Sequence, residues 1–241
     1  MPHLHKETFV CLDVESTGLD PETDRLIEIA AVKFTWDGQL ASYETLVNPT
    51  SPIPAESTAI HNITDDMVTG KPLAADIVPD LIEFVGEAPI VGHGILFDLK
   101  MLDAEARREG IRSAFTLQTS IDTLRLARLY GESPNNSLET LRKHFHIPLH
   151  GAHRAMNDVL VNIEVFKRLA SSFTTLRSII DRLKQPILLK AMPLGKHKGR
   201  PFPDIPTQYL QWAVRQDFDD DLIFSLKQEL ERRKSGSTFS Q

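Results

Sequence analysis

The sequence lacks several features of secreted and membrane proteins. Cys11 is the only cysteine among the 241 residues. A disulfide within the chain is therefore impossible, and a reducing compartment is favoured. We find neither a signal peptide nor an apolar run long enough to span a bilayer. These absences predict a soluble, cytoplasmic protein that does not enter a membrane.

Positive charge is also scarce. The chain has 27 Lys and Arg against 33 Asp and Glu, which gives a formal net charge of -6. Nucleic-acid-binding proteins usually have a basic excess, so binding of that kind must be argued from local charge. Hydrophobic residues make up 41% and charged residues 25%, the balance of a folded globular chain. The length allows one large domain, or an ordinary domain and a small one.

Two carboxylates interrupt the apolar stretch 9–19. In a strand, side chains at i and i+2 project to the same face, so Asp13 and Glu15 point the same way. Leu12 and Val14 then point to the opposite face. Adjacent carboxylates in an apolar strand repel each other and are costly to desolvate. A divalent metal ion would offset both charges, although such a pair alone is also common on half-exposed strands.

The remaining pattern predicts strands first and then strands alternating with helices. Two strands, at 26–34 and 39–47, are joined by a hairpin at Asp37 and Gly38, so the first three strands form an antiparallel meander. Short strands are predicted at 89–93 and between 115 and 121. Helices are predicted at 55–61, 74–86, 97–110, 122–130, 137–145, 154–170 and 174–185. We therefore expect an α/β fold with a mixed five-stranded sheet flanked by helices.

The composition changes near Gln185, where we place a boundary between domains 1–185 and 186–241. From Arg182 to Arg200 the segment has six basic residues and neither Asp nor Glu. Two short helices are predicted at 207–216 and 221–234, followed by a disordered tail. Basic residues near Tyr209 and Trp212 suit phosphate contact and base stacking. Alternatively, the two aromatic side chains form the core of a small helical module.

Two more acids and a histidine occur in later segments. Asp98 is expected in the first turn of a helix, where the helix dipole also favours a negative side chain. Asp158 borders the apolar stripe of its helix, so we expect it to lie over the sheet. His153 precedes Asp158 by five residues and does not share its helix face. An imidazole that titrates near neutrality suits a general base for water, although each residue taken singly is equally compatible with a solvated position.

Together these residues resemble a known family. The series Asp13-x-Glu15-x-Thr17-Gly18, His93-x-x-x-Phe97-Asp98 and His153-x-x-x-x-Asp158 resembles the three motifs of the DEDDh 3′-to-5′ exonucleases. That family contains the proofreading subunit of bacterial DNA polymerase III and exodeoxyribonuclease X. The resemblance covers roughly residues 7–170, and residues 194–212 resemble the small C-terminal module of exodeoxyribonuclease-X-like proteins.

The chain departs from the family pattern at two positions. Gly94 stands where the family often has Asn. In residues 60–67, which are similar to a loop of the family, Asn62 replaces the usual Gly. This second change is mild, because Asn also tolerates positive φ.

The resemblance implies a ribonuclease-H-like fold and a set of site residues. Two Mg²⁺ or Mn²⁺ ions would be held by the four acids, and His153 would take the proton of the attacking water. Leu19 would wedge against the last base. Substrate contacts are implied for Thr17, Gly18, Leu19, His61, Ile63, His93 and Phe97. Core packing is the alternative for Ile63 and Phe97, and a satisfied loop position is the alternative for His61.

These inferences predict a metal-dependent 3′-to-5′ exonuclease that releases nucleoside 5′-monophosphates from DNA, either single-stranded or at the 3′ ends of duplexes. The alternatives are a proofreading subunit bound to a DNA polymerase, an RNA-directed exonuclease of the same fold, and a binding module without catalysis. The intact acid set argues against the last, because clustered carboxylates repel phosphate. A monomer and a homodimer are equally compatible with the sequence.

Overall fold

The centre of the molecule is a mixed five-stranded sheet with the order β3-β2-β1-β4-β5. The computed structural model describes residues 3–130, 135–148 and 154–236. The predicted antiparallel meander is confirmed, and the sheet is extended by two short strands that continue it in parallel from β1. The strands are β1 (Phe9–Ser16), β2 (Leu26–Thr35), β3 (Gly38–Leu46), β4 (Ile90–Gly92) and β5 (Ser120–Asp122).

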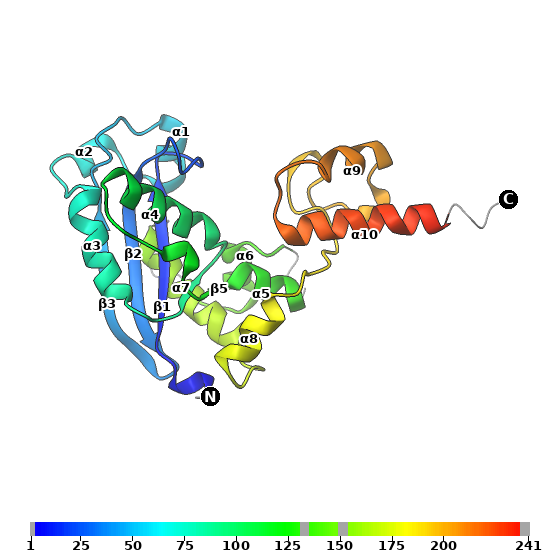
Figure 1. Ribbon diagram of the computed structural model, residues 1–241, viewed down its shortest axis with the longest axis horizontal. Coiled ribbons are helices and arrows are strands. Elements are labelled where there is room, and N and C mark those ends of the chain that lie inside the picture. Colours follow the sequence, from blue (N-terminus) through cyan, green and yellow to red (C-terminus); the bar gives the residue numbers. More distant parts are fainter. Residues whose placement is uncertain (1–2, 131–134, 149–153, 237–241) are drawn as a thin grey trace.

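Helices cover both faces of this sheet (Figure 1). One face carries α3 (Ala74–Val85) and α4 (Leu96–Arg108). The other carries α5 (Thr123–Tyr130), α6 (Leu138–His144), α7 (Ala155–Leu169) and α8 (Leu176–Leu183). The short helices α1 (Ala55–His61) and α2 (Asp65–Val68) follow β3. The predicted α/β fold is confirmed, and no helix of the described residues is long and apolar enough to span a bilayer.

The alternation of side chains along β1 determines what each face of the sheet contains. Val10, Leu12 and Val14 are buried in the cluster formed with α3 and α4. Phe9 and Cys11 are buried in the cluster formed with α7. Continuing the second face along the strand leads to Asp13 and then to Glu15. The two acids therefore share one face of β1, as their spacing predicted, and this face is the α7 side.

Several predicted boundaries differ from the structure. The fifth strand was expected within 115–121, but Phe115–Leu117 forms a 3-10 turn and the strand is only three residues long. The helix expected at 122–130 starts at Thr123, because Asp122 belongs to β5. The four-residue helix α2 was not predicted. The helix expected at 174–185 is limited to Leu176–Leu183 and starts from a Thr175 cap, whose hydroxyl accepts a hydrogen bond from the Ser178 N–H at 3.2 Å.

A C-terminal module (residues 186–236) has an apolar cluster of its own. It contains 3-10 turns at Gly195–His197 and Phe202–Asp204 and the helices α9 (Thr207–Ala213) and α10 (Asp220–Gly236). The predicted tail starts too early, because α10 continues beyond Lys234 to Gly236; residues 237–241 lie outside the described residues. The domain boundary near Gln185 stays a prediction, with which this separate cluster agrees. Its buried members are Met192, Phe202, Ile205, Leu210, Ala213, Leu222 and Leu226.

Arginines of α5 fix the module to the rest of the chain, which we call the sheet domain. The Arg125 guanidinium donates to both carboxylate oxygens of Asp221, at 2.9 and 2.8 Å. Arg128 donates to the same carboxylate at 2.9 Å and to Asp219 at 2.8 Å. Asp221 is only 1% exposed and also accepts the Ile187 N–H at 3.0 Å. Three arginine donors from the sheet domain on one buried carboxylate make a fixed joint rather than a loose tether.

Removing the charge of Asp221 should loosen this joint. Asp221→Asn leaves the two arginines without their shared buried partner, so we expect the free energy of unfolding to fall by about 3 kcal/mol. Asp220 is the exposed neighbour in the same helix, and Asp220→Asn should cost less than about 1 kcal/mol. Urea denaturation of both variants measures the difference. Equal stability of the two variants would show that the joint contributes nothing.

Candidate active site

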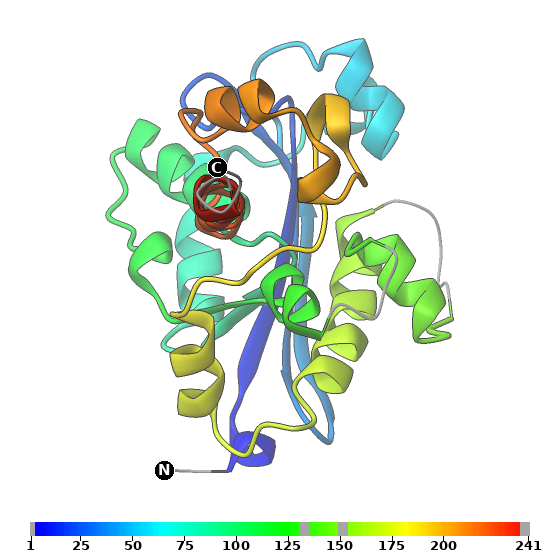
Figure 2. The ribbon, with the colours of Figure 1, turned by 90° about the vertical axis from the view of Figure 1, so that its right-hand side faces the viewer.

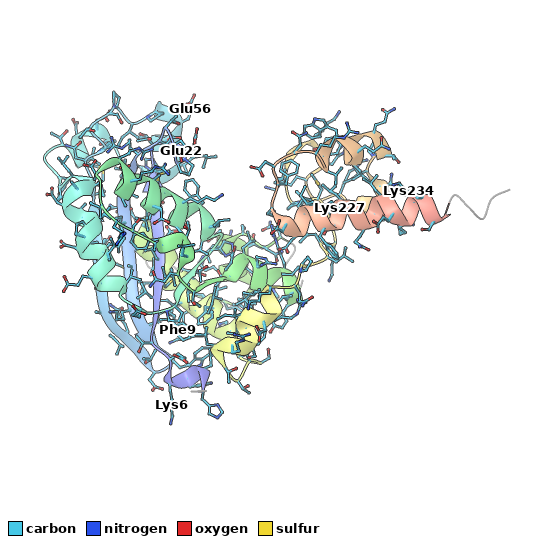
Figure 3. The ribbon with its side chains drawn as sticks, viewed as in Figure 1. Lys6, Phe9, Glu22, Glu56, Lys227 and Lys234 are labelled. Atoms are coloured by element: carbon cyan, nitrogen blue, oxygen red, sulfur yellow. The ribbon has the colours of Figure 1, made fainter. Side chains whose placement is uncertain are left out.

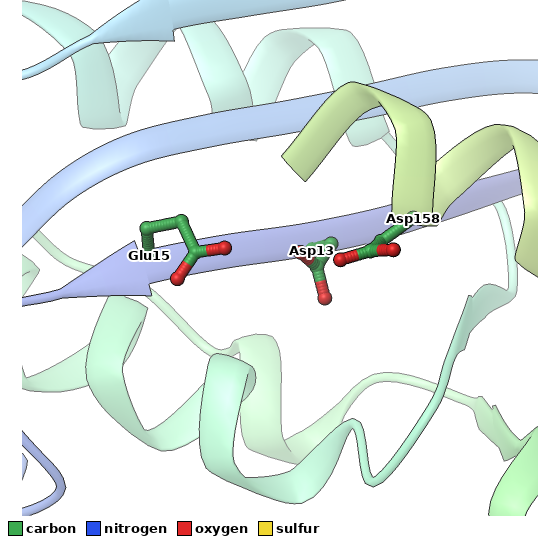
Figure 4. Close-up of side chains that lie close together, drawn as sticks. All are labelled: Asp13, Glu15 and Asp158. Atoms are coloured by element: carbon green, nitrogen blue, oxygen red, sulfur yellow. The ribbon is translucent and has the colours of Figure 1, made fainter. Parts of the chain in front are cut away.

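Three carboxylates from β1 and α7 converge on the α7 side of the sheet. Asp13, Glu15 and Asp158 each offer an oxygen atom, and these atoms all lie within 4.8 Å of one another (Figure 4). Asp158 is in the first turn of α7, beside Val159, which is buried in the core. It therefore hangs over β1 at the border of the apolar stripe, as predicted. The small side chain of Ala30 lies opposite Asp13 in the ladder.

Asp98 reaches the same strand from α4. It lies in the first turn of that helix and is 6% exposed, and its Oδ1 accepts the N–H of Val14 at 3.0 Å. Asp98 is not one of the three acids with mutually close oxygen atoms. Its charge nevertheless raises the pKa of Asp13, so the two carboxylates are electrostatic neighbours. The structure thus gathers three predicted acids into a cluster and places the fourth beside it.

Burial and mutual repulsion keep protons on these acids. The pKa of Asp13 is raised well above its usual value by burial and then by the charges of Asp98, Asp158 and Glu15. Burial, followed by the charge of Asp158, raises the pKa of Glu15 to about 7. Burial also raises the pKa of Asp98 to about 8, although the Val14 N–H opposes the shift. A cation in the cluster would reverse these shifts, because it favours the ionised form. The residues therefore fit divalent metal ions.

A fifth carboxylate, Glu28, lies next to the cluster and was not predicted. Glu28 is opposite Glu15 in the ladder between β1 and β2 and is 0% exposed. Its Oε1 accepts the Arg154 Nε at 2.8 Å and also contacts Arg154 Nη2. Its Oε2 accepts the N–H of Ala155, the first residue of α7, at 3.2 Å. Glu28 therefore fixes the start of the helix that carries Asp158.

Arg154 also acts directly on the acid cluster. Its charge lowers the pKa of Glu15 and so opposes part of the effect of Asp158 and Glu28. The sequence contained one weak indication that Glu28 has a structural role, since it is the only charged residue between Leu26 and Val32. A buried charge in such a run needs a partner. Nothing local in the sequence identifies that partner, which lies 126 residues away.

The turn after β1 is held by Asp24. The Thr17 hydroxyl donates to Asp24 Oδ1 at 3.2 Å, and the Asp20 N–H donates to Asp24 Oδ2 at 2.9 Å. A Cβ at Gly18 would lie 2.5 Å from that carboxylate, so a larger residue there would displace Asp24 from these hydrogen bonds. Thr17 is 5% exposed, whereas Leu19 is 86% exposed. The residues predicted to contact the 3′ end, Thr17, Gly18 and Leu19, thus form a hydrogen-bonded turn from which the apolar side chain of Leu19 projects.

His61, at the end of α1, is buried beside this turn. Helix α1 is connected to the turn by the Ser57 hydroxyl, which donates to the Thr17 carbonyl at 2.6 Å. The His61 Nδ1 accepts the Ile63 N–H at 3.0 Å, so Nε2 carries the ring proton. Nε2 is buried and has no hydrogen-bond partner among the described residues, and burial lowers the pKa of the ring. Asn62 has φ 60°, the left-handed conformation that its side chain tolerates.

The other predicted substrate residues make packing contacts or hydrogen bonds within the protein. Ile63 is 0% exposed and packs with Ile27, Ile53 and Val68. Phe97 is half-buried and packs on the α4 side of the sheet. His93 Nδ1 lies 3.0 Å from the Thr123 hydroxyl, and the ring also hydrogen-bonds the main chain of Asn136. Burial lowers the pKa of His93. His153, the predicted general base, lies outside the described residues.

Comparison with known families agrees with this arrangement. The family described as "Exonuclease" matches residues 10–166, which include β1, α4 and most of α7. The chain belongs to this exonuclease family. Its mixed sheet flanked by helices is the ribonuclease-H-like fold that we expected. A second family, described as "Putative quorum-sensing-regulated virulence factor", matches residues 181–228 of this exonuclease-family chain.

Individual relatives include polymerase proteins and a nuclease. The DNA polymerase III PolC-type of Caldanaerobacter subterraneus subsp. tengcongensis is 36% identical over 66% of this chain, which spans only 11% of that protein. The DNA polymerase III subunit epsilon of Treponema pallidum is 35% identical over 66% of this chain and 74% of its own length. The structure of Exonuclease X in complex with 5′ overhanging duplex DNA is 25% identical, with a TM-score of 0.57, over 72% of this chain and 98% of that chain.

Metal binding by this exonuclease-family chain should strengthen with pH. Glu15, with a pKa of about 7, and Asp98, with a pKa of about 8, must lose protons before they bind a cation. We expect the Mn²⁺ affinity measured by titration calorimetry to rise at least about tenfold from about pH 6 to about pH 8.5. In Glu15→Gln the dependence should be weaker. An affinity that is equal at both pH values contradicts the electrostatics described above.

The same carboxyls make the stability of the metal-free protein depend on pH. Their raised pKa values mean that the folded chain binds more protons than the unfolded chain above about pH 4. The stability they contribute is therefore complete below that pH and is lost as the pH rises through about 7 to 8. Melting temperatures without metal should fall across this window, and Mn²⁺ should restore more of the loss at the higher pH.

Replacing Glu28 should separate its role from that of the cluster. Glu28→Gln removes the carboxylate to which the Arg154 guanidinium is hydrogen-bonded, and because Arg154 is 36% exposed we expect a loss of about 2 kcal/mol. Glu87 is exposed in the turn after α3, so Glu87→Gln is the control and should change stability by less than about 0.5 kcal/mol. Urea denaturation measures both. A Glu28→Gln protein as stable as the control would exclude Glu28 as the anchor of α7.

Proposed function

We propose that this protein is a metal-dependent 3′-to-5′ exonuclease that hydrolyses DNA to nucleoside 5′-monophosphates. The observation that carries the proposal is the cluster of Asp13, Glu15 and Asp158 oxygen atoms within 4.8 Å, with buried Asp98 beside it. A purely structural site does not need four neighbouring acids, three of which (Asp13, Glu15 and Asp98) have pKa values raised by burial and nearby charge. Membership of the exonuclease family supports the same function.

We infer that the four acids hold two divalent ions, Mg²⁺ or Mn²⁺. When bound, such ions activate water and stabilise the leaving oxygen of a phosphodiester. The chain's own contribution is to hold the carboxylates in place. Asp13 and Glu15 are on a central strand, the Val14 N–H orients Asp98, and the Glu28 carboxylate fixes the start of α7 before Asp158. Ligands on rigid elements keep their positions when the metal is exchanged.

His153 is the proposed general base. It directly precedes Arg154, whose guanidinium is fixed to Glu28. The backbone next to His153 is therefore tied to the central sheet. A neutral imidazole accepts a proton from water near neutral pH, whereas the carboxylates of the site would be engaged with the metal ions.

The turn at Thr17, Gly18 and Leu19 is the proposed stop for the 3′ end. The Asp24 contacts make this turn rigid, and Leu19 projects from it with the apolar surface that a wedge against the last base needs. His61 would contribute its buried Nε2–H as a donor to the terminal nucleotide, because a buried donor without a partner is costly. Ile63, His93 and Phe97 would support the pocket from behind.

DNA is the proposed substrate, at 3′ ends of single strands or duplexes. Relatives named DNA polymerase III PolC-type and DNA polymerase III subunit epsilon favour a second proposal, that the chain proofreads for a DNA polymerase. Co-purification with a replicative polymerase subunit tests this second proposal. Digestion of matched DNA and RNA oligonucleotides tests the substrate. Equal or faster release from RNA would replace DNA as the preferred substrate.

Two substitutions test the catalytic proposal. With 3′-labelled single-stranded DNA and Mg²⁺, Asp158→Ala should abolish mononucleotide release. His153→Ala should reduce the rate by about 10² to 10⁴-fold, the usual contribution of a general base. His3 is exposed near the N-terminus, so His3→Ala should retain the full rate. Release by Asp158→Ala at the normal rate would refute the proposed site.

A further inference from the structure

The C-terminal module divides its charges between two segments. Acids are concentrated in residues 217–221 at the start of α10, where Asp219 and Asp221 pair with arginines of the sheet domain. Residues 186–216 contain five Lys and Arg and a single Asp. The anchoring thus uses acids of the module and leaves its basic segment outside the joint. In a chain with a net charge of -6, this local basic excess requires an explanation.

The basic side chains project from a turn with a well-defined backbone. In this basic turn (residues 194–200), the Gly199 N–H donates to the Met192 carbonyl at 2.7 Å and the Met192 N–H donates to the Arg200 carbonyl at 2.9 Å. Lys196, Lys198 and Arg200 are all exposed. None of the ion pairs found within the described residues includes any of the three. Their charges are therefore available to a partner.

Aromatic rings continue from the basic turn to the surface of α9. His197, in the turn, packs edge-on against Tyr209 with ring centroids 4.4 Å apart. Tyr209 contacts Trp212 at 5.2 Å. His197 is buried and Tyr209 packs against the module's apolar cluster, but Trp212 is 51% exposed. Of the two roles considered for these aromatics, Tyr209 thus has the packing role, while Trp212 presents a supported ring to solvent.

The module stands on the side of the sheet domain to which the acid cluster belongs. Figure 1 shows the module set off from the sheet domain, beyond α5. In Figure 2, seen from that side, the module lies in front of blue β1, which is visible between green α4 and yellow-green α7. The carboxylates come from these same three elements. A DNA strand whose 3′ end lay at the acid cluster and whose remainder extended toward this side would meet the module.

We propose that the basic turn and Trp212 bind single-stranded DNA upstream of the 3′ end that occupies the acid cluster. Lys196, Lys198 and Arg200 would neutralise successive phosphates, and Trp212 would stack on a base, a combination typical of proteins that hold single strands without sequence preference. A second grip suits this chain, because its carboxylates repel the polyanion that they must receive. The inference rests on the proposed exonuclease function and adds where the rest of the strand is held.

The test compares two groups of lysines and arginines. One variant combines Lys196→Ala, Lys198→Ala and Arg200→Ala; its control combines Lys6→Ala, Lys71→Ala and Lys227→Ala, which removes the same charge from other exposed positions. Figure 3 labels Lys6 near the N-terminus at the bottom of the sheet domain and Lys227 on α10 of the module. Binding is measured by fluorescence anisotropy with a labelled single strand of about 20 nucleotides, in an Asp158→Asn background that prevents digestion. Trp212→Ala is measured in the same way.

The basic variant should bind the strand at least about tenfold more weakly, and its salt dependence should fall by about two in slope. Trp212→Ala should lose about tenfold in affinity with little change in slope, since stacking releases no counterions. The control should bind like the parent. Equal affinity of parent and basic variant, or an equal loss in the control, overturns the proposal.

Hydrolysis separates this proposal from the proposed function. With Asp158 restored, the p-nitrophenyl ester of thymidine 5′-monophosphate reports the acid cluster alone, because it has no upstream strand. The basic variant should hydrolyse it at the parent rate while its KM for the long strand rises about tenfold. Failure of the parent to hydrolyse either substrate refutes the exonuclease function, and the anisotropy result still decides the binding proposal. A parallel loss on the ester in the basic variant overturns the upstream role.

Discussion

The interaction on which the rest of the structure depends is the repulsion between the carboxylates at the end of β1. Asp13, Glu15 and Asp158 are held together although burial and neighbouring charges raise the pKa values of Asp13 and Glu15. Such an arrangement persists only when the surrounding elements are rigid enough to oppose the repulsion. The two apolar clusters that enclose β1 supply this rigidity, one against α3 and α4 and the other against α7.

Arginine–carboxylate pairs then connect the segments that the apolar clusters do not fix. Arg154 and Glu28 join α7 to β2. Arg25 and Glu105 join the loop after β1 to α4, and Glu105 also accepts the Leu26 N–H at 2.9 Å. The first pair fixes the start of the helix that carries Asp158, and the second fixes the loop after β1 that contains Leu19. The planar fork of arginine suits these positions, because it binds a carboxylate in a defined orientation.

Local pattern was sufficient for the elements that are long and regular. β1 and β2, the hairpin to β3, α3 and α7 followed from alternation or helical periodicity, and the alternation along β1 also predicted that its two acids share one face. It was insufficient where an element is short: β5 has three residues, too few to show a period. It was also insufficient for contacts distant in sequence. Glu28 is 126 residues from Arg154, and Arg125 is 96 residues from Asp221, so neither pair is visible to a local rule.

The site residues divide in the same way. The acids were found because the resemblance depends on sequence motifs, and a motif can be recognised without knowing which residues are in contact. The burial of Ile63 and the orphaned Nε2 of His61 depend on how α1 packs beside the turn after β1, which spacing does not encode.

The joint between Arg125 and Asp221 has a consequence for the length of the products. A module on a flexible linker would follow its DNA strand as the strand shortened, whereas a module fixed by three arginine donors on one carboxylate stays at one distance from the acids. A strand that reaches both grips then has a minimum length, and below it the advantage of simultaneous contact is lost at once rather than gradually. The fixed distance between the acids and the module would thereby determine the strand length at which digestion slows.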